Sequence, residues 1–436
     1  MKKVLIITYY WPPSGGGGVQ RWLKMVKHLP TYGWEPVVLA PENPDYPLID
    51  ESLTADIPEN LEVVKVPIIE PRRFYQFLQK KKTGKDSGPS ADELFFVDKA
   101  KLSFKSKMLL WARANLLIPD ARRFWVKPAS RFVKKYIKEN QVDAIITSGP
   151  PHSLHLIGLK VHRDTGLPWV ADFRDPWTQI EFFERMPLSD TSRRKHERYE
   201  KAVMTEANAV LAVADHWVKV FSGIGAKNVH LVTNGFDPAD FPDESAPLDT
   251  TFNLGHFGTF AGDRNPQPLW QALKQLADAS SEFKKDLRIH LAGKVDPQIF
   301  TSIKEEGLEE HLEFFGYVSH QRAVELMMNS GVLLLLINDS QANAPGRMTG
   351  KIFEYLASRR PILCVGPEDC DPAVVLKQTE AGLTVAPDDV EKLKETIAAW
   401  YADFQENKLH VSASGYMKYS RKTLSEKVAG VLDGVV

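Results

Sequence analysis

Four consecutive glycines at positions 15–18 are the first feature of the chain that could bind a ligand. They follow Pro12-Pro13 and precede a helix-like stretch, so the backbone there can approach a ligand and the N–H groups of the helix start can face an anion. We expect Gly16 and Gly17 to line such a site. The run is not the spaced dinucleotide fingerprint, and no Gly-Lys-Ser/Thr follows it, which excludes a nucleotide-hydrolase phosphate loop. A flexible turn between a strand and a helix is the alternative.

A second anion site is indicated near the end of the chain. Thr349 and Gly350 have the character of a helix start, and the positive end of the helix dipole would face an anion there. Lys351 and Arg347 would add full positive charges. Glu354 lies three residues after Lys351 and on nearly the same helix face, where its carboxylate could accept hydrogen bonds from two ribose hydroxyls. An ordinary surface Lys–Glu pair is the alternative.

A third turn carries small residues and one arginine. Gly258 and Thr259 follow an apolar run, so a ligand could pack directly on their backbone. Arg264 comes a few residues later and is suited to phosphate oxygens. We expect all three residues to contact the same anionic ligand.

One histidine and two carboxylates could serve acid–base or hydroxyl-binding chemistry. His152 follows an apolar run, where its imidazole could donate to a substrate oxygen near neutral pH. Asp172 and Asp175 flank Arg174 after the next run, and such carboxylates can hold hydroxyls or transfer protons. We predict catalytic roles for His152, Asp172 and Asp175. In the alternative reading His152 is structural, and Arg174 merely neutralises its neighbours.

The elements that must position these residues are continuous apolar runs separated by helix-like segments. Such runs indicate parallel strands that are buried on both faces between helix layers. Ligands of these sheets bind beyond the carboxyl ends of the strands, which is where the candidate residues stand. The runs occupy residues 4–7, 36–40, 61–66, 144–147, 169–171, 209–213, 253–257, 288–292, 312–315, 332–337, 361–365 and 383–386.

The alternation restarts after a polar, proline-rich stretch at residues 238–249. We therefore predict an α/β protein of the doubly wound class, with two Rossmann-like domains facing each other across a deep cleft. The N-terminal domain would comprise residues 1–232 and the ligand-binding C-terminal domain residues 233–410. A final helix within residues 411–436 would pack back on the N-terminal domain.

The overall composition excludes several protein classes. The chain has 436 residues, of which 43 % are apolar and 25 % charged, as in ordinary globular proteins. Its two cysteines suit a reducing compartment and are too few for a Cys-rich zinc site, and we expect no bound metal. No run reaches the roughly 18 apolar residues of a membrane-spanning helix. We expect a cytoplasmic protein.

Residues 71–136 are strongly basic. They hold 17 lysines and arginines against 5 acidic residues, a net charge of +12 in a chain whose total is −1. Aromatic side chains among these cations favour attachment to the inner, anionic face of a membrane. Alternatives are a charged substrate, a nucleic acid or a merely solvated face, although no nucleic-acid recognition module is present. The residues expected at this surface are Trp111, Arg113, Arg122, Arg123, Trp125 and Lys127.

Taken in order, these motifs resemble those of GT-B fold glycosyltransferases. More narrowly, they are similar to the large retaining family, glycosyltransferase family 4, that includes sucrose synthases and bacterial mannosyltransferases. The resemblance extends from Met1 to about Tyr401. The stretches at 118–120 and 172–177 resemble a bacterial subgroup that makes surface polysaccharide. The most specific matches are Pro12-Pro13 with the glycine run, Thr233-Asn234-Gly235-Phe236-Asp237, and the segments 314–318 and 351–356.

This resemblance implies a UDP- or GDP-linked sugar donor held mainly by the second domain. A saccharide or lipid-linked saccharide acceptor would bind the first, and no cofactor would be needed. Glu354 matches the ribose-binding glutamate of the family, and Arg264 and Lys351 its diphosphate contacts. The loop at Tyr317 and Val318 is where the family's backbone meets the base.

Two positions depart from the family pattern. Gly346 stands where the family often has a second glutamate, eight positions before the ribose ligand. Asn265-Pro266 stands where a lysine commonly follows the arginine of the second domain. These departures shift the expected diphosphate contacts toward Lys351 and Arg347.

The implied reaction moves the sugar with retention and without a metal. Negative charge develops on the departing nucleoside diphosphate, and cations and a helix N-terminus can stabilise it. The family is thought to use front-side attack assisted by a donor phosphate oxygen, and His152 would then hydrogen-bond the donor sugar. Rival readings are a nucleotide-sugar 2-epimerase of the same fold, a dinucleotide oxidoreductase, and a non-enzymatic anion- or nucleic-acid-binding protein. The sequence predicts no particular oligomeric state.

Overall fold

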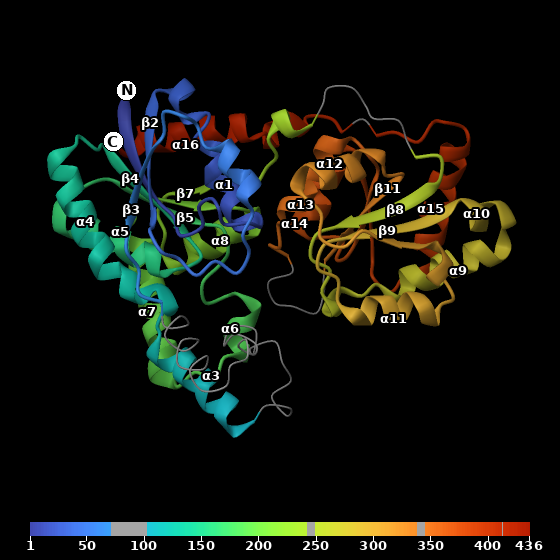
Figure 1. Ribbon diagram of the computed structural model, residues 1–436, viewed down its shortest axis with the longest axis horizontal. Coiled ribbons are helices and arrows are strands. Elements are labelled where there is room, and N and C mark those ends of the chain that lie inside the picture. Colours follow the sequence, from blue (N-terminus) through green and yellow to red (C-terminus); the bar gives the residue numbers. More distant parts are fainter. Residues whose placement is uncertain (71–102, 242–248, 338–344, 412) are drawn as a thin grey trace. The chain divides into compact units, whose positions relative to one another are not determined.

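The computed structural model describes residues 1–70, 103–241, 249–337, 345–411 and 413–436 and divides the chain into two compact units (Figure 1). The N-terminal unit comprises Met1–Thr233 and Arg421–Val436, and the C-terminal unit comprises Asn234–Ser420. The chain therefore passes from one unit to the other twice, after Thr233 and after Ser420.

The N-terminal unit is built on a seven-stranded sheet in the order β3-β2-β1-β4-β5-β6-β7, in which neighbouring strands are parallel. Residues Val4 to Ile7 of β1 are completely buried, as expected of a central strand covered on both faces. The strands are β1 (Lys2–Ile7), β2 (Trp34–Pro41), β3 (Glu62–Val66), β4 (Ala144–Gly149), β5 (Trp169–Phe173), β6 (Ala209–Ala212) and β7 (Val229–Leu231).

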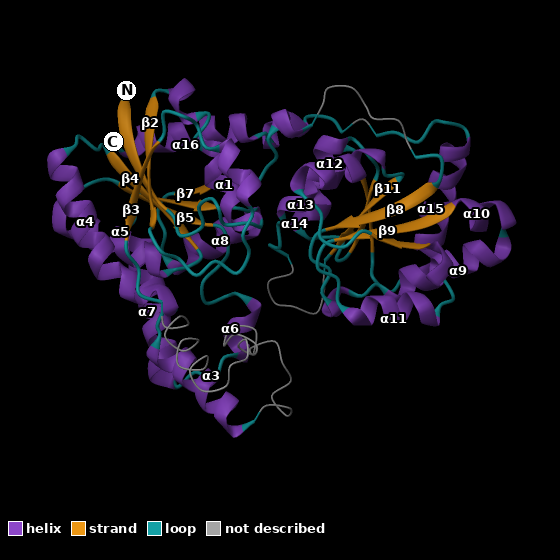
Figure 2. Cartoon of the chain, in the orientation of Figure 1, coloured by secondary structure: helices purple, strands orange, loops and turns teal. Residues whose placement is uncertain are grey.

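Helices cover this sheet on both faces (Figure 2). The last helix, α16 (Arg421–Val435), lies against α1 (Gly17–Met25), and its Leu424, Val428 and Leu432 belong to the same apolar core as the first strands. The remaining helices of the unit are α3 (Phe104–Leu116), α4 (Val126–Glu139), α5 (Ser153–Thr165), α6 (Glu181–Arg185), α7 (Asp190–Glu206) and α8 (Asp215–Ile224).

The C-terminal unit has a six-stranded parallel sheet in the order β10-β9-β8-β11-β12-β13. Its strands are β8 (Phe252–Phe257), β9 (Leu287–Ala292), β10 (Leu312–Phe314), β11 (Val332–Leu336), β12 (Ile362–Val365) and β13 (Gly382–Val385). Its helices are α9 (Gln267–Ala279), α10 (Ser281–Asp286), α11 (Pro297–Glu305), α12 (His320–Asn329), α13 (Gly350–Ser358), α14 (Asp371–Thr379) and α15 (Val390–Gln405). The prediction of two doubly wound α/β halves is confirmed.

The strand order reverses once in each sheet, between β1 and β4 and between β8 and β11. A crevice forms where the connections leave in opposite directions, and ligands of open α/β sheets bind there. In the C-terminal unit the loop after β8 and the helix α13, which follows β11 in the chain, belong to that point. Among the described residues no helix combines the length and the apolar character needed to cross a bilayer.

Candidate active site

The ammonium group of Lys351 is the centre of the candidate site in the C-terminal unit. Its Nζ atom lies 2.8 Å from Nε2 of His256 and 3.0 Å from the carbonyl oxygen of Thr259. Burial and the nearby charge of Arg264 lower the pKa of Lys351 to about 7, while the charge of Glu354 acts in the opposite direction. Lys351 is half-buried, and an ammonium group whose hydrogen bonds go to uncharged acceptors is suited to receive an anion.

Glycines bring three loops close together beside this lysine. A Cβ atom on Gly258 would lie 2.7 Å from Cε of Lys351, and one on Gly293 would lie 2.5 Å from the carbonyl oxygen of Gly258. Both glycines also have positive φ angles, 111° and 110°. The N–H of Gly293 donates to the carbonyl of Gly316 at 2.7 Å. The carboxyl ends of β8, β9 and β10 thus meet with their backbones exposed for close approach.

The start of α13 is the second half of this site. Thr349 is its N-cap residue but makes no side-chain cap bond, and its Oγ1 atom has no hydrogen-bond partner among the described residues. Gly350 and Lys351 are the first two helical residues, so their N–H groups are among the four that a helix leaves free. The hydroxyl of Tyr355 accepts a 3.1 Å hydrogen bond from the N–H of Phe257, which ties α13 to the end of β8.

The other residues predicted to bind the nucleotide sugar differ in how exposed they are. Arg264 ends the short 3₁₀ helix η7 (Gly262–Arg264), and its charge acts on both Lys351 and His256. Arg347 and Glu354 are half-buried, before and within α13. In the loop after β10, the side chain of Tyr317 is 65 % exposed and Val318 is half-buried. The structure thus places Gly258, Thr259, Arg264, Lys351 and Glu354 in one neighbourhood.

The glycine run of the N-terminal unit forms the start of α1. Gly16 is the N-cap residue with a φ of 84°, and both Gly16 and Gly17 are exposed. A Cβ atom on Gly18 would lie 3.1 Å from the ring of Tyr10 and 3.2 Å from Nη1 of Arg174. The same Nη1 donates to the carbonyl of Gly18 at 2.5 Å. Arg174 therefore organises the glycine loop rather than only neutralising neighbouring carboxylates.

His152 is the N-cap residue of α5 and stacks on an indole. Its ring lies parallel to that of Trp177, with 4.9 Å between the ring centres. Burial lowers the pKa of His152 to about 4, so the imidazole is uncharged at neutral pH. Its Nδ1 atom has no hydrogen-bond partner among the described residues. The ring therefore carries no positive charge, and its unpartnered nitrogen is buried.

The prediction of a catalytic Asp172 is corrected by its surroundings. Asp172 is fully buried, and its carboxylate pairs with Arg21 at 2.8 Å. It also accepts hydrogen bonds from Nε1 of Trp22 and Oγ of Ser148, each at 2.8 Å. A carboxylate so completely engaged and shielded from solvent cannot reach a substrate, so its role is structural. Asp175, by contrast, is exposed.

Of the residues of the predicted basic surface, Trp125 is an interior residue and Arg122 is half-buried among internal contacts. Trp125 is fully buried, and its indole donates to the carbonyl of Val66 at 3.2 Å. Arg122 lies over the ring of Tyr9 at 4.7 Å and pairs with the buried Glu70 at 3.6 Å. The prediction that Trp125 lies at a membrane surface is therefore wrong, and Arg122 is engaged mainly with Tyr9 and Glu70 of its own unit.

The rest of that surface is more accessible, and part of the basic segment, residues 71–102, lies outside the described residues. Trp111 is 49 % exposed on α3, and Lys127 is exposed on α4. Arg113 and Arg123 are half-buried, and each donates to a backbone carbonyl, of Leu117 and Leu116 respectively.

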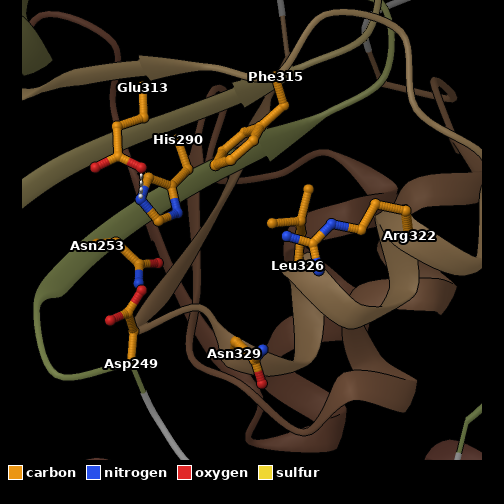
Figure 3. Close-up of a pocket in the computed structure, with 8 residues that line it drawn as sticks. All are labelled: Asp249, Asn253, His290, Glu313, Phe315, Arg322, Leu326 and Asn329. Carbon is orange, nitrogen blue, oxygen red and sulfur yellow. Dashed lines mark ion pairs between the residues drawn. The ribbon is translucent and has the colours of Figure 1, made fainter.

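A pocket of about 210 Å³ lies beside α12, on one face of the C-terminal sheet (Figure 3). His290 and Glu313 both line this pocket, with Nε2 of the histidine 3.4 Å from Oε2 of the glutamate. No predicted donor residue lines this pocket, so it is separate from the Lys351 neighbourhood. Its lining residues are Asp249, Asn253, His290, Glu313, Phe315, Arg322, Leu326 and Asn329.

Sequence reasoning missed His256 altogether. It stands inside the apolar run of β8 and is 2 % exposed, so it has the pattern of an ordinary core residue. Its partner Lys351 is 95 residues further along the chain, and no local spacing connects the two.

Asp369 and Asp371 flank Cys370 at the start of α14, yet no group of three or more His, Cys, Asp or Glu side chains in the described part of the chain is placed to hold a metal ion.

Comparison with known families identifies the part of the chain that carries the Lys351 neighbourhood. Residues 251–403 match the family model described as glycosyl transferases group 1. We call this segment of the C-terminal unit, which is similar to that family, the group 1 domain. Gly258, Arg264, Lys351 and Glu354 all lie inside this domain. No curated protein sequence matches the chain.

Solved structures share the fold of the whole chain. A sucrose-phosphate synthase from Thermosynechococcus elongatus has a TM-score of 0.63 at 13 % identity, with 100 % of this chain and 99 % of that chain covered. Alr3699/HepE from Anabaena, in complex with UDP-glucose, has a TM-score of 0.61 at 14 % identity and full coverage of both chains. WaaG, a glycosyltransferase involved in lipopolysaccharide biosynthesis, has a TM-score of 0.57 at 14 % identity, covering 99 % and 100 %. The whole chain thus has the GT-B fold, which consists of two Rossmann-like units, and the group 1 domain lies in the second of them.

Proposed function

We propose that this protein is a glycosyltransferase that moves a sugar from a nucleoside diphosphate sugar to a saccharide or lipid-linked saccharide. The observation that carries the proposal is Lys351, a half-buried lysine at the first turn of a helix, beside the backbone of Gly258. That arrangement suits a pyrophosphate, and it lies within the group 1 domain.

The proposed chemistry follows from the same groups. When the bond between sugar and phosphate breaks, negative charge grows on the departing nucleoside diphosphate. The ammonium of Lys351 and the free N–H groups of α13 stabilise that charge, so we propose that the transfer needs neither a metal nor a cofactor. Glu354 accepts the ribose hydroxyls, and the uncharged His152 hydrogen-bonds a hydroxyl of the substrate. Retention of configuration is proposed together with this site.

The choice of donor and role is supported by two structural neighbours. The neighbour from Anabaena is in complex with UDP-glucose, which makes UDP-sugars the first donors to test, followed by GDP-sugars. WaaG is involved in lipopolysaccharide biosynthesis, which supports a role in cell-surface polysaccharide synthesis.

We also propose that α3 attaches the protein to an anionic membrane surface that holds the acceptor. Phe104, Met108 and Trp111 are 82 %, 59 % and 49 % exposed, and their spacing of four and three residues places them on one helix face. Lys105 and Lys107 flank them on the same helix. Apolar side chains bordered by cations fit the boundary between anionic headgroups and acyl chains.

The test of the donor site is a thermal-shift and product screen with UDP-glucose, GDP-mannose and their free diphosphates. The matching nucleotide should raise the unfolding temperature by mass action, and transfer to an acceptor should survive EDTA. Lys351→Ala should abolish this rise in unfolding temperature. Lys394→Ala is the control and should preserve it, because Lys394 lies on α15 and pairs with Glu391. A screen in which no nucleotide shifts the wild-type protein would contradict the proposal. Free sugar or epimerised donor as the only product would indicate a hydrolase or an epimerase.

A further inference from the structure

The hydrogen bonds of His256 fix which of its nitrogens carries the proton. Nδ1 lies 3.0 Å from the carbonyl oxygen of Leu334. A carbonyl can only accept, which places the proton on Nδ1. Nε2 also lies 3.4 Å from the carbonyl oxygen of Thr259, but that oxygen accepts the shorter 3.0 Å bond from Nζ of Lys351, so it does not require a proton on Nε2. In the uncharged ring Nε2 then presents a lone pair, and it faces Nζ of Lys351 at 2.8 Å. The imidazole is thus a fixed acceptor for the lysine.

The imidazole cannot take a second proton while the lysine is charged. A proton on Nε2 would place an N–H against the ammonium group in a site shielded from water. Burial and the charge of Lys351 accordingly hold the pKa of His256 well below its ordinary value. The pair therefore carries at most one positive charge, and that charge belongs to Lys351.

The charge of Lys351 is itself in balance near neutral pH. Among the described residues the groups acting on Nζ are His256 from β8, Arg264 from η7 and Glu354 from α13 itself. Burial and Arg264 favour the neutral amine, and Glu354 favours the ammonium. With a pKa of about 7, the ligand-free protein holds both the charged and the neutral form of Lys351 around neutral pH.

We infer that His256 is a positioning residue for Lys351, and that binding of a nucleotide sugar is coupled to uptake of a proton by this lysine. The inference rests on the proposed function. A pyrophosphate diester brings two negative charges to Nζ and so stabilises the ammonium form. The proton comes from solvent and stays on Nζ while the ligand is bound.

The sign of the pH dependence follows directly. Below pH 7 the lysine is already charged, so affinity changes little with pH. Above pH 7 the free protein must gain a proton on binding, so the affinity falls by up to about tenfold for each pH unit. The fall continues until the pH reaches the higher pKa of Lys351 in the complex.

The test is isothermal titration calorimetry of the full chain with UDP-glucose and GDP-mannose. Neither diester has a phosphate that titrates near pH 7, so protons taken up must come to the protein. At pH 8, titrations in two buffers of different ionisation enthalpy should show uptake approaching one proton per ligand. The dissociation constant should rise by about tenfold between pH 7 and pH 8.5. Binding with no proton uptake and a flat pH profile would overturn this inference and leave the proposed function intact, whereas no binding of any nucleotide sugar would overturn both.

Variants separate positioning from simple structural support. Lys351→Arg keeps a permanent charge, so proton uptake should vanish while binding remains measurable. His256→Gln retains an oxygen for Nζ and an N–H for Leu334, and it should keep both the affinity and the pH profile. His256→Phe lacks the acceptor, so binding at pH 7 should weaken by about tenfold and the fall in affinity should begin at lower pH. If His256→Phe loses stability but keeps the wild-type profile, or if Lys351→Arg still takes up a proton, the assignment is wrong.

Discussion

Asp172 is fully buried and Lys351 is half-buried, and their partners give these two side chains opposite tasks. The carboxylate of Asp172 meets a full guanidinium charge from Arg21 together with two further donors, so nothing remains for a ligand. Lys351 donates instead to an imidazole and a carbonyl, neither of which carries a negative charge. The first pair is complete in the protein alone, whereas the second gains from an anion.

Because Asp172 is fully paired inside the protein, replacing it should lower the stability of the fold strongly. Asp172→Asn leaves the guanidinium of Arg21 buried without its counter-charge, which should lower the free energy of unfolding by about 3–5 kcal/mol. Urea denaturation followed by tryptophan fluorescence measures the loss. Asp175→Asn is the matched control, because Asp175 is exposed and its replacement should change stability by less than about 0.5 kcal/mol. An Asp172→Asn protein with wild-type stability but no turnover would restore the catalytic reading.

At the scale of secondary structure, α3 is held on one side and bare on the other. Leu110 packs with Leu109 and Met186 in a small apolar cluster. Asn115 donates to the carbonyl of Pro187 and accepts from the N–H of Ser189, each at 2.8 Å. These contacts secure the helix while leaving its aromatic face to solvent.

This arrangement predicts how α3 should behave with vesicles. The protein should sediment with anionic vesicles at low salt and less well at high salt, because lipid charge and lysine charge are screened. The double change Phe104→Ser and Trp111→Ser should weaken sedimentation by at least about tenfold, since two large apolar groups no longer enter the lipid. Leu383→Ser on β13 is a suitable control, because Leu383 is equally exposed at 49 % but lies in the other unit. Failure of the wild-type chain to sediment at low salt would exclude this use of α3.

Apolar runs predicted the strands well. A parallel strand that is buried on both faces can be recognised from its own residues, without knowing which strands lie beside it. The residues 4–7 and 332–337, for example, become β1 and β11 nearly as expected. Local pattern could not separate Trp111 from Trp125, since both stand among cations. Only the fold distinguishes them, because it buries Trp125 and pairs its indole with the carbonyl of Val66. His256 was hidden for the same reason, because its significance depends on a lysine brought to it by α13.

At the scale of the molecule, the N-terminal unit is assembled from two distant pieces of chain. Arg21 donates to the carbonyls of Val232 and Thr233 at 2.9 and 2.7 Å, which anchors the chain just before it leaves the unit. On its return the chain forms α16, and Oγ of Ser425 donates to the carbonyl of Met25 at 3.3 Å. The unit is therefore closed by residues that follow the whole C-terminal unit.

The stability of the N-terminal unit should consequently respond to changes in α16. Leu432→Ala removes a completely buried side chain and should cost about 2–5 kcal/mol of unfolding free energy. Lys427→Ala on the exposed side of the same helix should be nearly neutral. Differential scanning calorimetry should show the change in the transition of the N-terminal unit, with that of the C-terminal unit unmoved. An equal shift of both transitions would mean that the two units unfold as one.

The double passage of the chain also bears on how the protein is made. Domains generally fold in the order in which the ribosome releases them. Here residues 421–436 complete the first unit, so its core keeps an open side throughout synthesis of the 187 residues from Asn234 to Ser420. The second unit can finish folding first. Until α16 is made, the apolar surface of the first unit that it will cover stays accessible to chaperones.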